Sequence, residues 1–207
     1  MYVPAHFAMS PAEVSDLLSA IIAVDLISTT PDGLTATFLP MLYDRQAGTL
    51  QGHVARNNPH WRDATGTSLV IAHGPDAYVS PSWYPAKAEH GRVVPTWNYV
   101  TAHVYGQLVV HDDVEWLRSL VGRLTARHEE PRTEPWAMSD GPADYMEGQL
   151  RAIVGLELVI ERIEAKSKLS QNRSVADQEG VRAALAAGTP PEQALAERMT
   201  GVYRYPS

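Results

Sequence analysis

Short apolar runs rich in β-branched residues recur along the chain, and residues that favour turns separate them. These runs occupy residues 23–30, 34–42, 48–54, 67–73, 77–80, 93–110 and 154–163. Pro, Asp, Gly and Asn are concentrated in the gaps, a pattern typical of antiparallel strands joined by short turns. About six such strands predict a small closed barrel, because closure leaves no exposed sheet edge.

Helical periodicity begins on either side of the strand-rich region. Residues 10–13 read SPAE, a capping box with proline at the first helical position, and they predict a helix over about 11–22. Residues 112–115 read DDVE, in which Asp112 has the spacing of a second cap. The apolar stripe that follows predicts a helix with one buried face.

The C-terminal third is predicted to be mainly helical. A Pro-rich linker covers residues 130–142, and a short helix is expected near Ala143. Two more helices are expected at about 175–187 and 191–199, separated by Gly, Thr and Pro. Acidic residues outnumber basic ones in this helix pair, which argues against a DNA-recognition helix and makes nucleic acid an unlikely partner.

Composition excludes several classes of protein. The chain has 207 residues, a mass of 22.7 kDa, a formal net charge of −7 and no cysteine. Disulfides, thiolate catalysis and cysteine-held metals are therefore excluded. No apolar run is long enough for a membrane helix and no signal peptide is recognisable, so we expect a cytoplasmic protein that does not enter a membrane.

Aromatic residues gather between Tyr78 and Tyr105. This stretch holds Tyr78, Trp83, Tyr84, Trp97, Tyr99 and Tyr105. They are either ordinary packing residues of the barrel or the walls of a slot for a planar cofactor, with prolines holding the slot open.

Two polar segments carry candidate chemistry. In the first, His53 ends an apolar strand and Arg56 follows three residues later. A histidine at this place is commonly structural, but a neutral imidazole can hold haem iron and a nearby arginine can pair with a propionate or phosphate. In the second, residues 166–173 read KSKLSQNR, either a solvated turn or an anion-contacting loop in which Lys168 and Arg173 are the charged partners.

The chain resembles the PaiB family of the FMN-binding split-barrel superfamily. The resemblance rests on MYVP with HF near the start, GHVAR with NP and W at 52–61, GP with AYVSPSWY at 74–84, VPTWNY at 94–99, HVYG at 103–106, IVG at 153–155 and KLSQNR at 168–173. These motifs extend over nearly the whole chain. They imply a mainly β fold with flanking helices (α+β), a six-stranded antiparallel split barrel, and a homodimer with its cofactor at the subunit interface.

The resemblance implies two different functions. One branch of the family is described as FMN-binding negative transcriptional regulators. Another is similar to piperazate synthases, which use haem b to cyclise L-N5-hydroxyornithine to L-piperazic acid, forming an N–N bond. Three features favour haem here: Phe38 stands where regulators often carry a histidine, His53 is available as an iron ligand, and the acidic tail disfavours DNA. The first hypothesis is therefore a haem-dependent dehydrating cyclase with an amino-acid substrate, and FMN binding is the alternative.

The haem hypothesis gives each candidate residue a role. His53 is the axial ligand of the iron. Lys168 or Tyr99 supplies the proton for the leaving oxygen. The remaining cofactor-binding candidates are Arg56, Phe38, Trp83, Trp97 and Arg173. We predict a split-barrel domain with flanking helices over 1–165 and a C-terminal loop with short helices over 166–207, packed on the barrel.

Overall fold

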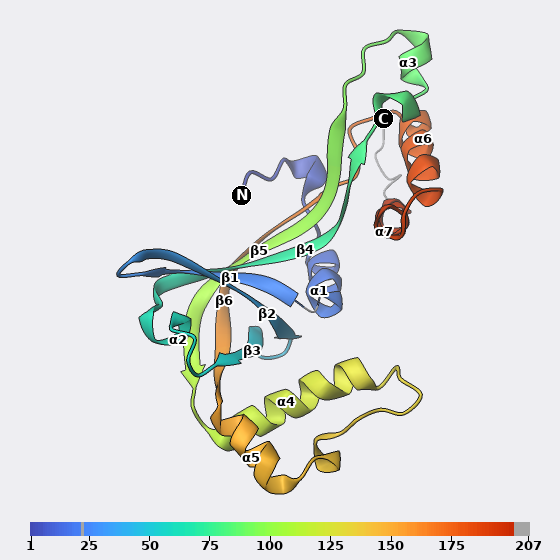
Figure 1. Cartoon of the computed structure of the whole chain (residues 1–207). Coiled ribbons are helices and arrows are strands. Elements are labelled where there is room, and N and C mark those ends of the chain that lie inside the picture. Colours follow the sequence, from blue (N-terminus) through green and yellow to red (C-terminus); the bar gives the residue numbers. More distant parts are fainter. Residues whose placement is uncertain (22, 201–207) are drawn as a thin grey trace. The chain divides into compact units, whose positions relative to one another are not determined.

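Six strands form a closed barrel in the order β1-β2-β3-β6-β5-β4 in the computed structural model, which describes residues 1–21 and 23–200 (Figure 1). The strands are β1 Ala23–Thr30, β2 Gly33–Asp44, β3 Thr49–Ala55, β4 Thr65–Val79, β5 Thr96–His111 and β6 Ile153–Lys168. The α-helices are α1 Pro11–Ala20, α2 His60–Asp63, α3 Ala86–Glu89, α4 Val114–Glu129, α5 Ala143–Arg151, α6 Val175–Ala186 and α7 Pro190–Met199. Single 3-10 turns lie at Ala5–Phe7, Pro81–Trp83 and Met138–Asp140. The predicted α+β fold with a six-stranded antiparallel split barrel is confirmed.

The chain divides into two compact units. Of the described residues, the first unit contains 1–17, 73–102 and 164–200, and the second contains 18–21, 23–72 and 103–163. The strands β1, β2 and β3 belong wholly to the second unit, whereas β4, β5 and β6 contribute to both. The division predicted at residue 165 stays a prediction.

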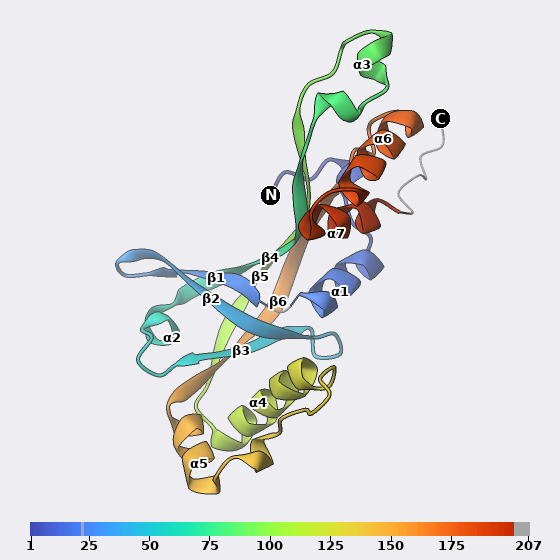
Figure 2. The ribbon, with the colours of Figure 1, turned by 45° about the vertical axis from the view of Figure 1, so that its right-hand side comes forward.

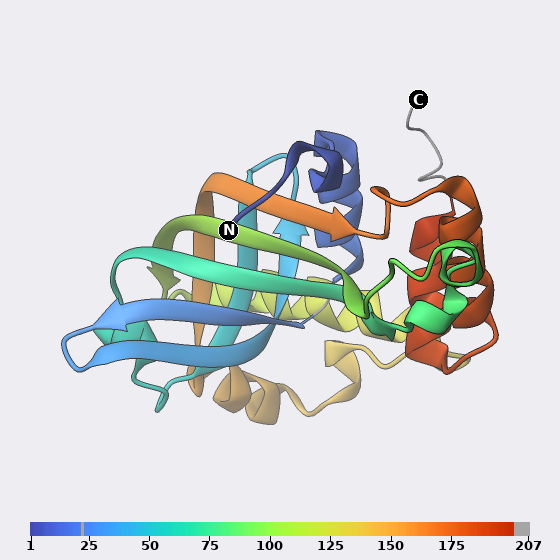
Figure 3. The same cartoon turned by 90° about the horizontal axis from the view of Figure 1, so that it is seen from above.

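The second unit begins with a long hairpin. β1 and β2 pair antiparallel from Ala23 opposite Pro40 to Thr30 opposite Gly33, as the two blue ribbons of Figure 3 show. Gly33 has a φ of 113°, which a residue with a side chain rarely adopts, so glycine is needed at this turn. Buried Leu26 and Val70 alternate with half-buried positions on the same strands, as expected for one face turned to the core.

Helix α4 packs beside β3 in the second unit (Figure 2). Its buried residues Leu120 and Leu124 form an apolar cluster with Leu42 of β2. Asp113 caps the helix, because its Oδ1 accepts a hydrogen bond of 2.8 Å from the backbone N–H of Trp116. The prediction that Asp112 caps this helix is wrong by one position, because the side chain of Asp112 pairs with Arg56 instead.

The first unit carries the helical tail. α6 and α7 contact each other, and both lie at the orange-to-red end of the chain in Figure 2. The carboxylate Oδ1 of Asp177 accepts a hydrogen bond of 3.1 Å from the backbone N–H of Ala86, which ties α6 to α3. The two helices predicted at 175–187 and 191–199 are confirmed within a residue of their observed ends.

Several predicted boundaries shift. The first helix ends at Ala20, and residue 22 of its predicted range lies outside the described residues. The runs at 67–73 and 77–80 belong to one strand, β4, which continues through Gly74 and Pro75. The late strand continues five residues beyond Ile163, so the two lysines of the polar segment at 166–173 lie on β6.

Candidate functional site

His53 lies on β3, opposite Gly155 of β6 in the strand register. Its Nδ1 is buried and has no hydrogen-bond partner among the described residues. Burial lowers the pKa of His53, so the imidazole is neutral at pH 7. A neutral ring with an unpaired buried nitrogen is unusual for a purely structural histidine, since buried polar atoms are normally satisfied.

A cavity of about 310 Å³ adjoins His53 within the second unit. This volume is at the lower end of the range for small-molecule pockets. Apolar side chains from β2, α4 and the following loop form most of its wall. The lining residues are Pro40, His53, Val121, Leu124, Thr125, His128, Glu129 and Trp136.

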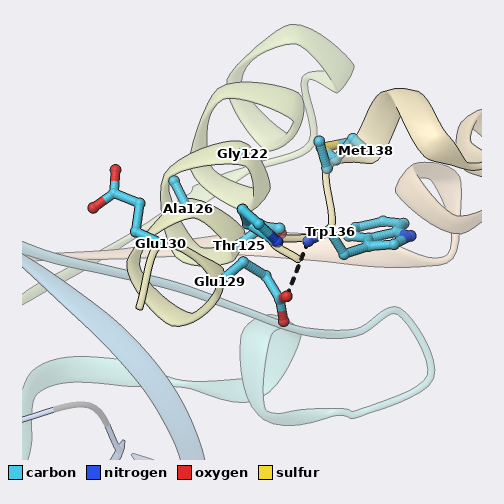
Figure 4. A pocket seen from close by; sticks show the side chains of 9 residues that line it. Gly122, Thr125, Ala126, Glu129, Glu130, Trp136 and Met138 are labelled. Atoms are coloured by element: carbon cyan, nitrogen blue, oxygen red, sulfur yellow. Dashed lines mark hydrogen bonds between the residues drawn. The ribbon is translucent and has the colours of Figure 1, made fainter. Parts of the chain in front are cut away.

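A second cavity of about 360 Å³ shares part of this wall (Figure 4). In Figure 4, Thr125 and Glu129 of α4 lie on one side, and Trp136 and Met138 of the linker lie on the other. The backbone N–H of Trp136 donates a hydrogen bond of 3.0 Å to Oε2 of Glu129, which fixes the linker against the helix. Thr125, Glu129 and Trp136 line both cavities, so the two cavities adjoin at these residues.

The guanidinium of Arg56 forms hydrogen bonds within the second unit. It donates to both carboxylate oxygens of Asp112, at 2.9 and 2.5 Å, and to the carbonyls of Arg151 and Ile153, at 2.7 and 3.1 Å. The hydrogen bond from Arg56 lowers the pKa of Asp112, and Asp112 in turn raises the pKa of Arg56. Arg56 therefore braces the ends of β3, β5 and β6 here, and pairing with a cofactor would require it to leave Asp112.

Phe38 projects from β2, where it pairs in register with Asp25. Phe38 is 71% exposed, so it is not a residue of the hydrophobic core. The structure brings His53 to a cavity wall, but Phe38 is absent from that wall.

The remaining sequence candidates lie in the first unit. Trp97 donates a hydrogen bond of 2.7 Å from Nε1 to Asp76 and meets Tyr78 edge-on, with 6.3 Å between the ring centroids. Trp83 ends a 3-10 turn. Its carbonyl oxygen lies so close to Gly180 of α6 that a side chain at position 180 would clash with it. These aromatics thus form part of the packing of the first unit, and Trp97 keeps half of its surface exposed.

Lys168 and Tyr99 lie together in the first unit. The Lys168 Nζ donates to Oγ1 of Thr96 at 2.5 Å and to the carbonyl of Trp97 at 2.6 Å, and it lies 6.0 Å from the Tyr99 ring centroid. Burial, followed by the charges of Lys166 and Arg173, lowers the pKa of Lys168. A lysine with a lowered pKa is a stronger acid than a solvated one, which suits a proton donor.

Sequence reasoning missed Trp136 and His128 as cavity residues. Trp136 stands in the Pro-rich linker. An aromatic residue among polar neighbours there was the one sequence feature that could have indicated a tertiary contact. His128 lies in the last turn of α4, and only the packing of that helix beside β3 reveals its place. Among residues 1–21 and 23–200, no group of three or more histidine and carboxylate side chains is arranged to hold a metal ion.

Comparisons with known sequences identify the family. Residues 1–162 match the model of a family described as Putative FMN-binding domain. The chain is also 34% identical to Protease synthase and sporulation protein PAI 2 of Bacillus subtilis, over 86% of this chain and 85% of that protein.

Comparisons with solved structures show the same fold. A conserved hypothetical protein, Rv2991 of Mycobacterium tuberculosis, matches with a TM-score of 0.59 and 14% identity, over 84% of this chain and 94% of that one. The FAD and haem binding protein of Mycobacterium smegmatis matches with a TM-score of 0.59 and 18% identity, over 87% of this chain and 79% of that one. The family model and the Bacillus relative place the chain in the PaiB family of FMN-binding split-barrel proteins.

Proposed function

We propose that this protein is a haem b-dependent enzyme that cyclises L-N5-hydroxyornithine to L-piperazic acid with loss of water. The observation that carries the proposal is the His53 imidazole, which is neutral, has an unpaired buried Nδ1, and stands in the wall of a mostly apolar cavity. Neutral imidazole is a common axial ligand of haem iron, and apolar walls suit a porphyrin face. His53 is the residue that would hold the iron.

The chain's own groups supply the remaining requirements. When bound, haem iron would act as a Lewis acid on the oxygen of the hydroxylamine. The protein must bring the two nitrogens of one substrate molecule together, which is mainly a proximity effect. Lys168, whose pKa is lowered by burial, is the first sequence-based candidate for the proton of the departing oxygen, and this role stays a prediction. Tyr99 is the second candidate for that proton.

Partners and location follow as part of the same proposal. We propose a homodimer in the cytoplasm that acts on a small amino acid and binds no nucleic acid. Within the described residues, no helix is both long and apolar enough to cross a bilayer.

FMN binding is the second candidate. It is favoured by the family description, which covers residues 1–162. In that case the protein would be an FMN-binding negative transcriptional regulator, which requires it to bind promoter DNA by itself. Such binding would weaken as salt rises, because phosphate contacts release counterions.

The absorption spectrum of the purified protein separates the two candidates. The haem proposal expects a Soret band and conversion of L-N5-hydroxyornithine to a product lighter by one water. His53→Ala should lose the Soret band and keep the circular dichroism of the folded chain. His90→Ala, which changes an exposed histidine, is the matched control and should keep the haem.

Three results contradict the haem proposal. They are flavin bands released on denaturation, a Soret band unchanged in His53→Ala, and a low-salt shift of promoter DNA by the protein alone. The first and third together would favour the regulator instead.

A further inference from the structure

Three positively charged side chains in the first unit have no acidic partner among the described residues. They are Lys166, Lys168 and Arg173, and none of the ion pairs among residues 1–21 and 23–200 includes any of them. Two of the chain's three lysines are in this group, although the chain as a whole carries a formal charge of −7. An uncompensated cationic cluster in an acidic protein creates a strong local potential for anions.

Lys166 is the most buried of the three. Its side chain lies on β6 and the residue is only 8% exposed. The ammonium lies 5.8 Å from the ring centroid of Tyr2, 5.6 Å from that of Phe7 and 5.3 Å from that of Tyr99. These rings stabilise the charge in part, but a buried ammonium normally has a charged partner.

Lys168 shares the Tyr99 ring with Lys166. The two residues are two apart on β6, so their side chains leave the same face of the strand. The hydrogen bonds to Thr96 and Trp97 hold the Lys168 ammonium in place and leave one N–H unused. The charges of Lys166 and Arg173 both lower the pKa of Lys168, which indicates that the three cations lie near one another.

Arg173 completes the group from the loop after β6. Its guanidinium carbon lies 5.0 Å from the ring centroid of Tyr84, and none of its side-chain N–H groups donates to a described residue. A guanidinium stacked on a ring in this way still presents its donors to a planar or tetrahedral oxyanion.

The loop between Lys168 and Arg173 is held in shape by its own side chains. Ser170 adopts a φ of 67°, which is uncommon for a residue other than glycine. Its hydroxyl accepts a hydrogen bond of 2.9 Å from Nδ2 of Asn98. Gln171 accepts from the backbone N–H of Leu169 at 2.7 Å and donates to the carbonyl of Ser167 at 2.6 Å. The arginine is therefore positioned before any ligand arrives, which lowers the entropic cost of binding.

Two acids of the same unit are engaged elsewhere. Asp76 accepts from the indole of Trp97, and Asp177 accepts from the backbone N–H of Ala86. A solvated surface patch would explain Arg173 alone, but it does not explain a lysine as buried as Lys166.

We propose that Lys166, Lys168 and Arg173 form a site for an oxyanion, the phosphate or carboxylate group of a small molecule. Three cations exceed the charge of one carboxylate, so a phosphate is the better-matched occupant. The site goes beyond the proposed function, which places the cofactor at His53: it shares Lys168 and Arg173 with the candidates of that hypothesis and adds Lys166, which the proposed function does not use. A protein without haem would leave this inference intact.

Calorimetric titration with inorganic phosphate tests the site. Ionic strength is kept constant with sodium chloride, so that screening does not imitate binding. Saturable binding is expected, and Arg173→Gln should weaken it by about tenfold or more, as for other hydrogen bonds to charged groups. Lys166→Met keeps the apolar stem of the lysine and should weaken binding similarly. Lys87→Met removes the third lysine, which is exposed and donates to Ser82, and should leave the affinity unchanged.

Further probes distinguish the source of the oxyanion. Acetate tests a carboxylate, and FMN is compared with riboflavin, which lacks the phosphate. If Arg173→Gln weakens FMN but not riboflavin, the occupant is the phosphate of a flavin nucleotide. If Arg173→Gln weakens inorganic phosphate or acetate and leaves FMN unchanged, the occupant is a separate small molecule.

The proposal fails if phosphate, acetate and FMN all show no saturable binding above the chloride background. It fails equally if Arg173→Gln binds them as tightly as the unchanged protein does. Because Arg173 lies on a loop, this variant keeps the test valid even if Lys166→Met does not fold. The Soret band of the same preparations reports on the haem proposal separately.

Discussion

At the scale of single residues, His60 shows how a buried histidine is satisfied in this fold. It is 1% exposed, and its Nδ1 and Nε2 lie 2.8 Å from the hydroxyls of Thr37 and Ser28. Ser28 in turn lies 2.7 Å from the hydroxyl of Ser68. His53 differs, because its buried Nδ1 has no such partner. The contrast identifies His60 as structural, whereas a ligand role for His53 stays a prediction.

The burial of His60 predicts how stability depends on pH. Burial lowers the pKa of His60 in the folded protein, whereas the unfolded chain keeps a value near 6.5. The unfolded state then binds more protons as pH falls below 6.5, so stability is greatest above this value and decreases until the folded pKa is reached. Urea unfolding at pH 7.5 and at pH 5.5, roughly one unit to either side of the unfolded pKa, should give a lower free energy at the lower pH.

His60→Gln isolates this contribution. Glutamine can still bond to hydroxyls but does not titrate near neutral pH, so the variant should lose part of the pH dependence even if it is less stable overall. His53 shifts in the same direction and accounts for a remaining slope. An identical slope in the variant and the unchanged protein would show that His60 does not contribute.

At the scale of elements, the position of helix α4 determines the shape of the cavity beside His53, because α4 supplies part of the cavity wall. The ring of Trp116 stacks on His111, with 3.9 Å between centroids and an interplanar angle of 7°. A side chain on Gly155 would lie 2.2 Å from this indole ring, so only glycine fits on β6 opposite His53. Burial alone would raise the pKa of Glu157, but hydrogen bonds from Gln51, His111 and Thr49 together hold it below its usual range.

Gly155→Ala is therefore expected to displace Trp116 and tilt α4. The cost should be about 1–3 kcal/mol of unfolding free energy, as for other overpacked positions. Gly148→Ala in α5 is the matched control, because a side chain there meets nothing within 4 Å. It should be neutral or more stable by about 0.5–1 kcal/mol, since alanine favours a helix. Denaturant unfolding of both variants measures the difference, and equal stabilities would contradict the close fit.

Helices and strands with a regular pattern of apolar residues were predictable from sequence. Elements whose existence or length depends on a single tertiary contact were not. Alternating apolar residues and Pro-Asp-Gly turns located β1 and β2, and the capping box of Ser10 and Glu13 located α1. Gly74 and Pro75 read as a break, yet β4 continues because Gly74 lets Val100 of β5 approach where a side chain would clash. The short helices α2 and α3 each follow a proline and are too brief to show periodicity.

The candidate site was predictable only in part for the same reason. His53 was recognisable from the GHVAR segment, because that segment places a polar ring at the end of an apolar strand. The partner of Arg56, however, lies 56 residues away at Asp112, and no local pattern reveals that pairing. The cavity wall at Trp136 likewise depends on how the linker folds back along α4.

At the scale of the whole molecule, the family alone does not determine the reaction. The family is named for FMN, and the same fold occurs in a protein named for FAD and haem together, so the cofactor must be argued from the residues at the site. We propose haem on the basis of His53, and an oxyanion ligand on the basis of the cationic group at Lys166, Lys168 and Arg173. These are separate statements about two units of one chain, and they succeed or fail separately.

The exposed face of β2 bears on the predicted homodimer. Leu34 and Phe38 are 79% and 71% exposed, and their even spacing places both side chains on one face of the strand. Large apolar side chains exposed together on a strand commonly mark a protein interface. We expect a second copy of this chain to cover them.

Light scattering during size exclusion should therefore give a mass of about twice the 22.7 kDa chain. The double variant Leu34→Ser with Phe38→Ser should elute with the mass of one chain, because it removes the apolar area without touching the core. Tyr145→Ser with Val175→Ser, which changes two exposed apolar residues on helices, should remain dimeric. A single-chain mass for the unchanged protein would contradict the dimer, and a dimeric Leu34/Phe38 double variant would place its interface elsewhere.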